Sequence, residues 1–144
     1  MGLGIQAYSY LYAVHQASEY KVEAMIDQLV KLIPANYTGA CWGYDFPWEA
    51  RYASIPAYQP TVVATGIITN SLYIAHTTFN NSLARELVVK GCEFVITHLN
   101  RSVDEDGSFC FSYSPFDREK VFNASMKGSR LLAQGYQLTN NPEW

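Results

Sequence analysis

Three segments of this chain repeat one another at a nearly constant spacing. Leu11–His15 and Leu72–His76 share Leu, Tyr and His in the same order at an offset of 61 residues. A third segment follows at an offset of 60 residues, which pairs Leu72 with Leu132. Internal repeats of this length are typical of stacked helical hairpins, because each hairpin must bury its apolar side on its neighbours. The repeat therefore predicts an all-α fold of helical hairpins.

Two kinds of helical segment alternate along the chain. The first kind is rich in small residues and carries few charges, and we expect it over residues 2–16, 60–77 and 119–137. The second kind is amphipathic, with apolar residues at i, i+3, i+4 and i+7, and we expect it over residues 20–33 and 82–99. Buried first segments and amphipathic second segments predict two concentric layers. The predicted hairpins of this single domain cover about 2–33, 60–99 and 119–144.

Two long connecting segments, 34–59 and 101–118, lie at the end where helices of the first kind begin. Connections of this length in a compact domain are usually functional or disordered, and their aromatic content argues against disorder. At the opposite end the connections are short, and Ser18 and Ser82 are the expected N-caps of the amphipathic helices. The long loops are therefore the expected place for a functional site.

The two long loops carry related sequences. Cys41–Arg51 reads CWGYDFPWEAR and Cys110–Arg118 reads CFSYSPFDR, so both contain Cys, an aromatic residue, a small residue and Tyr, followed by an acid and an arginine. Tyr44 and Tyr113 occupy the same place in the two copies, and we expect them to reach one shared pocket. Aromatic faces, carboxylates and guanidinium groups gathered together suit a polar, ring-shaped ligand such as a sugar.

The composition excludes several classes of function. The 144 residues carry a formal net charge of −3 and contain no basic run, which disfavours binding to nucleic acid or to an acidic membrane surface. The three cysteines lack the spacing of a disulfide framework or a zinc site. Cys41 and Cys110 have no local His to activate them, so we expect small, buried apolar residues. We also expect no membrane span, no metal or cofactor, and a cytoplasmic location.

The two loop motifs, together with Pro60–Thr65 (PTVVAT), resemble bacterial α/α-toroid proteins associated with surface-polysaccharide biosynthesis. The resemblance covers nearly the whole chain. It implies a fold similar to that of the six-hairpin glycosidases and the terpenoid cyclases, with a sugar-containing ligand. Complete toroids of this type have about six hairpins, whereas only five helices are expected here. We therefore expect an arc of an (α/α)6-type toroid, completed by the remaining hairpins of a longer protein or by self-association.

The candidate catalytic residues are the loop carboxylates and the two matched tyrosines. Two carboxylates can act as acid and base across a glycosidic bond, and a tyrosine can move a proton in an epimerase or lyase. The alternatives are structural: a carboxylate can cap a turn, and a tyrosine hydroxyl can bond the backbone. The candidate catalytic residues are Asp45, Glu49, Asp117, Tyr44 and Tyr113.

The candidate substrate-binding residues are loop aromatics and cations, together with an asparagine. Tryptophan rings can stack on sugar faces, and arginines can bind an acidic sugar through two parallel hydrogen bonds. Each arginine can equally form a salt bridge within its own loop. The candidate substrate-binding residues are Trp42, Trp48, Arg51, Arg118 and Asn123.

Three functions remain open on these grounds. The first is a hydrolase, lyase or epimerase that acts on a bacterial polysaccharide when complete, with the fragment alone inactive. The second is a non-catalytic module that binds a glycan or a protein through the same loops. The third is an isoprenoid-processing toroid, but its Asp-rich acid motif is missing, and Asp104–Asp106 followed by glycine indicates a solvated turn.

Overall fold

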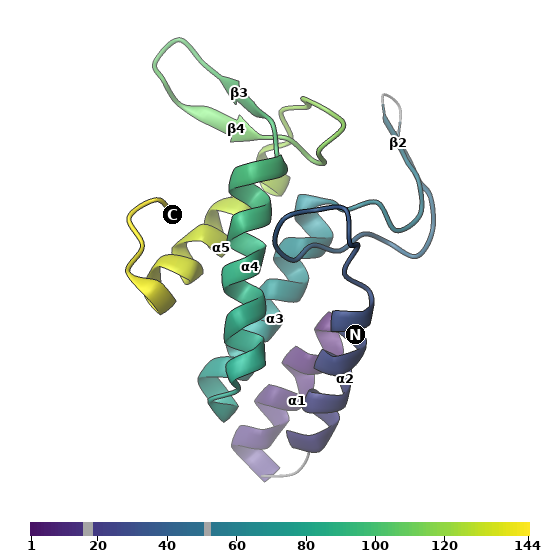
Figure 1. The fold of residues 1–144 in the computed structure, drawn as a ribbon, viewed down its shortest axis with the longest axis vertical. Helices are drawn as coiled ribbons and strands as arrows, with labels where there is room; N and C mark the ends of the chain where they lie inside the picture. Colours follow the sequence, from purple (N-terminus) through teal and green to yellow (C-terminus); the bar gives the residue numbers. More distant parts are fainter. Residues whose placement is uncertain (16–18, 51–52) are drawn as a thin grey trace.

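The computed structural model describes residues 1–15, 19–50 and 53–144, and these residues are mostly helical (Figure 1). Two short antiparallel β-hairpins lie in the segments that we expected to be loops, where Trp48 pairs with Ile55 and Arg101 pairs with Phe111. The helices are α1 (Gly2–His15), α2 (Glu19–Lys31), α3 (Val62–Phe79), α4 (Ser82–His98) and α5 (Phe122–Thr139). The strands are β1 (Trp48–Ala50), β2 (Ala53–Ile55), β3 (Arg101–Val103) and β4 (Phe109–Phe111).

The helices α1, α3 and α5 form a row in which α3 packs against both of the others. Helix α2 packs on α1, and α4 packs on α3 and α5. Figure 1 shows that α1, α3 and α5 all run from the end that carries the β-hairpins towards the opposite end. Both long connections therefore lie together, at the end where these three helices begin.

Helix α3 is the centre of this packing. Thr61 is its N-cap, and the Oγ1 atom of Thr61 accepts a hydrogen bond from the Ala64 N–H at 3.1 Å. The segment contains no Asp, Glu, Lys or Arg, so it can be covered by neighbouring helices on several sides. Its β-branched residues favour a strand locally. Burial against α1, α4 and α5 outweighs that preference, and the helix that we predicted is confirmed.

Two consecutive asparagines make the tight connection between α3 and α4. Asn80 ends α3 in the left-handed conformation, with φ at 55°, and its N–H bonds the His76 carbonyl. Asn81 is the N-cap of α4, because its Oδ1 atom accepts from the Ala84 N–H at 2.8 Å. Our prediction of Ser82 as the N-cap is therefore wrong, since Ser82 is the first residue inside the helix. The other predicted cap, Ser18, lies outside the described residues.

The hydrophobic core lies between the helices and includes side chains from the long connecting segments, of which Trp42 is the largest. Trp42 is 2% exposed and inserts its ring between α2 and α3. Among the described helices, none combines the length and the apolarity needed to cross a membrane. The largest fully buried side chains include Trp42, Phe94, Ile5, Ile26, Leu29, Leu72 and Leu131.

Candidate functional site

The two matched tyrosines meet where the long loops come together. The Oη atoms of Tyr44 and Tyr113 lie 3.2 Å apart, although 69 residues separate them in the sequence. Each loop is attached to the start of α3, because the Thr61 N–H bonds the Trp42 carbonyl and the Val62 N–H bonds the Tyr113 carbonyl. The prediction that the two hydroxyl groups lie together is confirmed, but of the two tyrosines only Tyr44 lines the cavity described below.

Two further aromatic rings stack on the tyrosine pair. The Trp48 ring stacks on Tyr113 with centroids 5.0 Å apart, and the Phe46 ring stacks on Tyr44 at 5.3 Å. Strand β1 delivers Trp48 to this position. We call Tyr44, Phe46, Trp48 and Tyr113 the aromatic rim. Its members range from half-buried to exposed, so the rim combines ring faces with hydroxyl groups at the surface.

Tyr113 is suited to hydrogen bonding and not to acting as a base. Burial, together with the hydrogen bond to Tyr44, raises the pKa of Tyr113 above its ordinary value. Tyr113 therefore stays protonated at neutral pH. Either hydroxyl group can donate its hydrogen atom to the oxygen of the other. The hydroxyl group that accepts keeps its own hydrogen atom and can donate it to a ligand oxygen.

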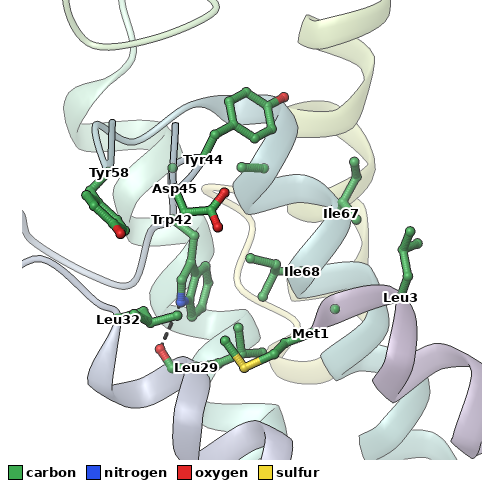
Figure 2. Close-up of a pocket in the computed structure, with 13 residues that line it drawn as sticks. Met1, Leu3, Leu29, Leu32, Trp42, Tyr44, Asp45, Tyr58, Ile67 and Ile68 are labelled. Carbon is green, nitrogen blue, oxygen red and sulfur yellow. Dashed lines mark hydrogen bonds between the residues drawn. The ribbon is translucent and has the colours of Figure 1, made fainter. Parts of the chain in front are cut away.

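A cavity of about 350 Å³ lies beside the aromatic rim, between the start of α1, the end of α2 and the start of α3 (Figure 2). Its walls are largely apolar, with Asp45 as its acidic side chain. Figure 2 shows the Asp45 carboxylate above the Trp42 ring, facing the opening between the loop and α3. The lining residues are Met1, Gly2, Leu3, Leu29, Leu32, Trp42, Gly43, Tyr44, Asp45, Tyr58, Ala64, Ile67 and Ile68.

Trp42 belongs to the core as well as to the cavity. Its Nε1–H donates to the Leu29 carbonyl at 2.9 Å, and its backbone N–H donates to the Thr65 Oγ1 atom at 3.1 Å. The indole donor is therefore already used within the protein. Because Trp42 is 2% exposed, only a small part of its ring reaches the floor of the cavity.

Asp117 holds a turn, which is the alternative that we considered for the loop carboxylates. Its Oδ1 atom accepts from the backbone N–H groups of Tyr113 and Glu119, at 3.0 and 3.1 Å. Its Oδ2 atom accepts from the N–H and the hydroxyl of Ser114, at 2.7 and 2.5 Å. Four donors fill the acceptor sites of a carboxylate. Asp117 thus fixes the turn that carries Tyr113, and we leave it out of the proposed site.

The remaining predicted residues lie away from the cavity or outside the described ranges. Glu49 is exposed on β1 and accepts from the Ser54 hydroxyl at 2.7 Å across the hairpin. Arg118 and Asn123 are exposed near the start of α5, and neither lines the cavity. Arg51 lies outside the described residues. The structure therefore joins Tyr113 and Trp48 to Tyr44, and Tyr44 in turn lines the cavity together with Asp45 and Trp42.

Tyr58 is a cavity residue that the sequence did not predict. It has a positive φ of 64°, and its N–H donates to the Tyr44 carbonyl at 2.6 Å. A non-glycine residue in this conformation is uncommon and is found mainly where the surrounding structure requires it. A tyrosine gives no local signal of such a backbone, so sequence reasoning had no means to identify it.

The cysteines are buried, as predicted for Cys41 and Cys110. Burial raises the pKa of the Cys41 thiol to about 12, and burial raises that of Cys92 to about 12 as well. Thiols of this kind are poor nucleophiles at neutral pH. Among the described residues, no three His, Cys, Asp or Glu side chains gather closely enough to hold a metal ion.

The buried thiols predict a loss of stability in alkali. In the unfolded chain a thiol ionises near pH 8.5, so between about pH 8.5 and 12 the folded state binds more protons. The free energy of unfolding should therefore fall as the pH rises, by about 1.4 kcal/mol per pH unit for each thiol. Urea unfolding at a series of pH values measures this slope. The double variant Cys41→Ala/Cys92→Ala should have a flatter profile, and an unchanged slope would contradict the assignment.

Comparison of the chain with protein-family models, with curated proteins and with solved structures gives no match. The function is therefore inferred from the chemistry of the rim and the cavity.

Proposed function

We propose that the chain is an arc of an α/α-toroid protein that acts on a carbohydrate. Its own contribution is a sugar-binding site where its two long loops meet. The observation that carries this proposal is the junction of the two loops. There the Tyr44 and Tyr113 hydroxyl groups lie 3.2 Å apart, beside a cavity of about 350 Å³ with the Asp45 carboxylate at its edge.

A sugar ring matches the chemistry of this junction. Its hydroxyl groups need hydrogen-bond acceptors and donors, which Asp45 and the tyrosine pair supply. Its axial C–H faces need flat apolar surfaces, which the aromatic rim supplies. The cavity volume falls within the range of small-molecule sites. The Asp45 charge disfavours an anionic sugar, so a neutral or amino sugar is the expected ligand.

Binding is favoured over catalysis by this chain alone. A glycosidase needs two carboxylates facing one bond, but Asp117 is occupied by its own turn and Glu49 does not line the cavity. Tyr113 stays protonated and is a poor base. A hydrolase, lyase or epimerase activity would then require groups supplied by other hairpins.

The apolar cavity wall favours a second candidate ligand, an isoprenoid. Leu29, Leu32 and Ile68 present aliphatic side chains that no sugar hydroxyl can bond. Farnesyl diphosphate serves as the test ligand here. Saturable binding of farnesyl diphosphate without binding of any sugar would favour this second candidate over the first.

The sugar proposal predicts that Asp45→Asn weakens binding about tenfold, because a hydrogen bond to a charged acceptor is stronger than one to a neutral acceptor by about 1.4 kcal/mol. Titration of the purified chain with oligomers of N-acetylglucosamine, of glucose and of glucuronic acid, followed by calorimetry or NMR shifts, measures the affinities. We expect the neutral sugars to bind more tightly than glucuronic acid.

Asp27→Asn is the matched control, since Asp27 is exposed on α2 and its replacement removes the same charge. It should bind like the unaltered chain. Trp48→Ala removes a ring of the aromatic rim and should also weaken binding, whereas Phe116→Ala, at an exposed position outside both the rim and the cavity, should not. The absence of saturable binding to any of these sugars, or equal affinities for Asp45→Asn and the unaltered chain, would reject the proposal.

A further inference from the structure

One backbone donor in the segment between α2 and β1 bonds a titratable ring. The Thr38 N–H donates to the Nε2 atom of His98 at 2.9 Å. A backbone N–H can only donate, so Nε2 must offer a lone pair and the hydrogen of the neutral ring must lie on Nδ1. Protonation adds a hydrogen to Nε2, and the ring then has no acceptor left. This bond therefore exists only while His98 is neutral.

A second histidine, His76 on α3, has the opposite arrangement. Its Nδ1 atom lies 3.1 Å from the Asn81 carbonyl oxygen. A carbonyl oxygen can only accept, so Nδ1 carries a hydrogen in the neutral ring and in the protonated ring alike. Protonation thus leaves this bond in place, and His76 is the natural comparison for His98.

Aromatic rings hold His98 in position for this bond. The His98 ring stacks on Phe94 with centroids 5.7 Å apart, and the Tyr37 ring packs against it edge-on at 5.2 Å. Two groups of the loop itself can titrate, Tyr37 and Cys41. Burial raises the pKa of Tyr37 and raises that of Cys41 to about 12, so both keep their protons in acid. Neither changes its charge when His98 does.

The charged side chains near His98 do not replace the lost bond. Among the residues that the structure describes, His98 takes part in no ion pair. Arg101, the nearest cation along the chain, lies over the rings of Phe109 and Phe111. His98 is the last residue of α4, and a helix C-terminus tolerates a positive charge. The ring can therefore be protonated while α4 stays folded, and only the contact with Thr38 is lost.

The contact with Thr38 holds a loop that leads to the cavity. The same loop makes a second hydrogen bond to α4, from the Ala40 N–H to the Lys90 carbonyl at 2.9 Å. That bond joins two backbone groups and does not titrate. The loop then continues to Trp42 and Asp45, which line the cavity. Of these two hydrogen bonds to α4, only the one to His98 depends on pH.

We propose that His98 is a pH-sensitive anchor of this loop. The neutral ring holds Thr38 at the end of α4, and the protonated ring releases it. The released form binds one more proton than the held form, so acid favours release. An imidazole ordinarily titrates at about pH 6.5, and below that pH the equilibrium constant for release should rise about tenfold per pH unit. This inference is independent of the sugar proposal.

NMR of the isotopically labelled chain tests both parts of the proposal. At pH 8, spectra of the ring nitrogens should show the hydrogen of His98 on Nδ1. Hydrogen exchange gives a protection factor for the Thr38 amide, which is corrected for the intrinsic effect of pH on exchange. We expect this factor to fall at least about tenfold between pH 8 and pH 5.

Three variants separate the acceptor from the ring. His98→Gln offers an amide oxygen that cannot take up a proton, so the protection of Thr38 should become independent of pH. His98→Phe keeps a ring against Phe94 but has no acceptor, so the protection should be low at both pH values. His76→Gln is the matched control and should respond to pH like the unaltered chain. Circular dichroism establishes that each variant is folded.

Several results would overturn the proposal. One is a hydrogen on Nε2 of His98 at pH 8, and another is an equal protection factor for Thr38 at pH 8 and pH 5. A third is a pH response that survives in His98→Gln or disappears in His76→Gln. If His98→Phe does not fold, the comparison of His98→Gln with His76→Gln decides the question.

Discussion

Replacing Trp42 by alanine is expected to lower the free energy of unfolding by about 3–5 kcal/mol, which is the usual effect of removing a large buried ring. The ring is 2% exposed, and its Nε1–H donates to the Leu29 carbonyl at the end of α2. The variant would leave a cavity between α2 and α3 and would release the loop from α2. Urea unfolding followed by circular dichroism measures the change.

Trp48→Ala provides the comparison, because Trp48 belongs to the same motif and to the same residue type. Its ring stacks on Tyr113 at the surface, and an aromatic pair of this kind contributes about 1 kcal/mol. We therefore expect a small loss of stability from Trp48→Ala and a large one from Trp42→Ala. Similar losses from the two variants would show that Trp42 is not the buried anchor of this loop.

Replacing Gly39 by alanine should destabilise the protein strongly. Gly39 has a φ of +83°, and a Cβ atom there would lie 2.2 Å from the Lys90 carbonyl oxygen and 2.8 Å from the Phe94 nitrogen. Both atoms belong to the backbone of α4 and cannot rotate away. A left-handed alanine costs about 1–2 kcal/mol, and overpacking adds about 1–3 kcal/mol. The expected total loss is about 2–5 kcal/mol.

Gly107→Ala separates the two contributions. Gly107 has the same φ of +83°, but a Cβ atom there would meet nothing within 4 Å. This variant should lose only the conformational part, about 1–2 kcal/mol. Urea unfolding gives the loss in free energy of unfolding for each variant. The difference between the two losses is the cost of forcing the Gly39 loop away from α4. Equal losses would mean that the loop can move away from α4 without penalty.

The helices were predictable because their signals are long and local. The uncharged stretch and the Asn-Asn pair define α3, and its predicted range of 60–77 differs from the observed Val62–Phe79 by two residues at each end. The prediction of Ser82 as the N-cap followed only from the general preference for serine at that position. The Oδ1 atom of the preceding Asn81 accepts from the Ala84 N–H instead. The signal was present, since Asn80–Asn81 recurs as Asn140–Asn141.

The site was predictable only in part because its geometry depends on distant contacts. The matched positions of Tyr44 and Tyr113 were enough to place them together. Strands of three residues, such as β1, are too short to show the alternation of a β-strand. Nothing near Asp117 in the sequence indicates that the surrounding turn occupies all of its acceptor sites. The burial of Trp42 likewise depends on a carbonyl in α2 that only the folded chain brings close.

The loop that follows α2 also joins the first hairpin to α4. The Ala40 N–H bonds the Lys90 carbonyl at 2.9 Å, and the Thr38 N–H bonds the His98 Nε2 atom at 2.9 Å. The same loop leads directly to Asp45. The loop is therefore fixed to α4 by backbone donors a few residues before Asp45, and a ligand bound at Asp45 would be held by a segment that is already anchored.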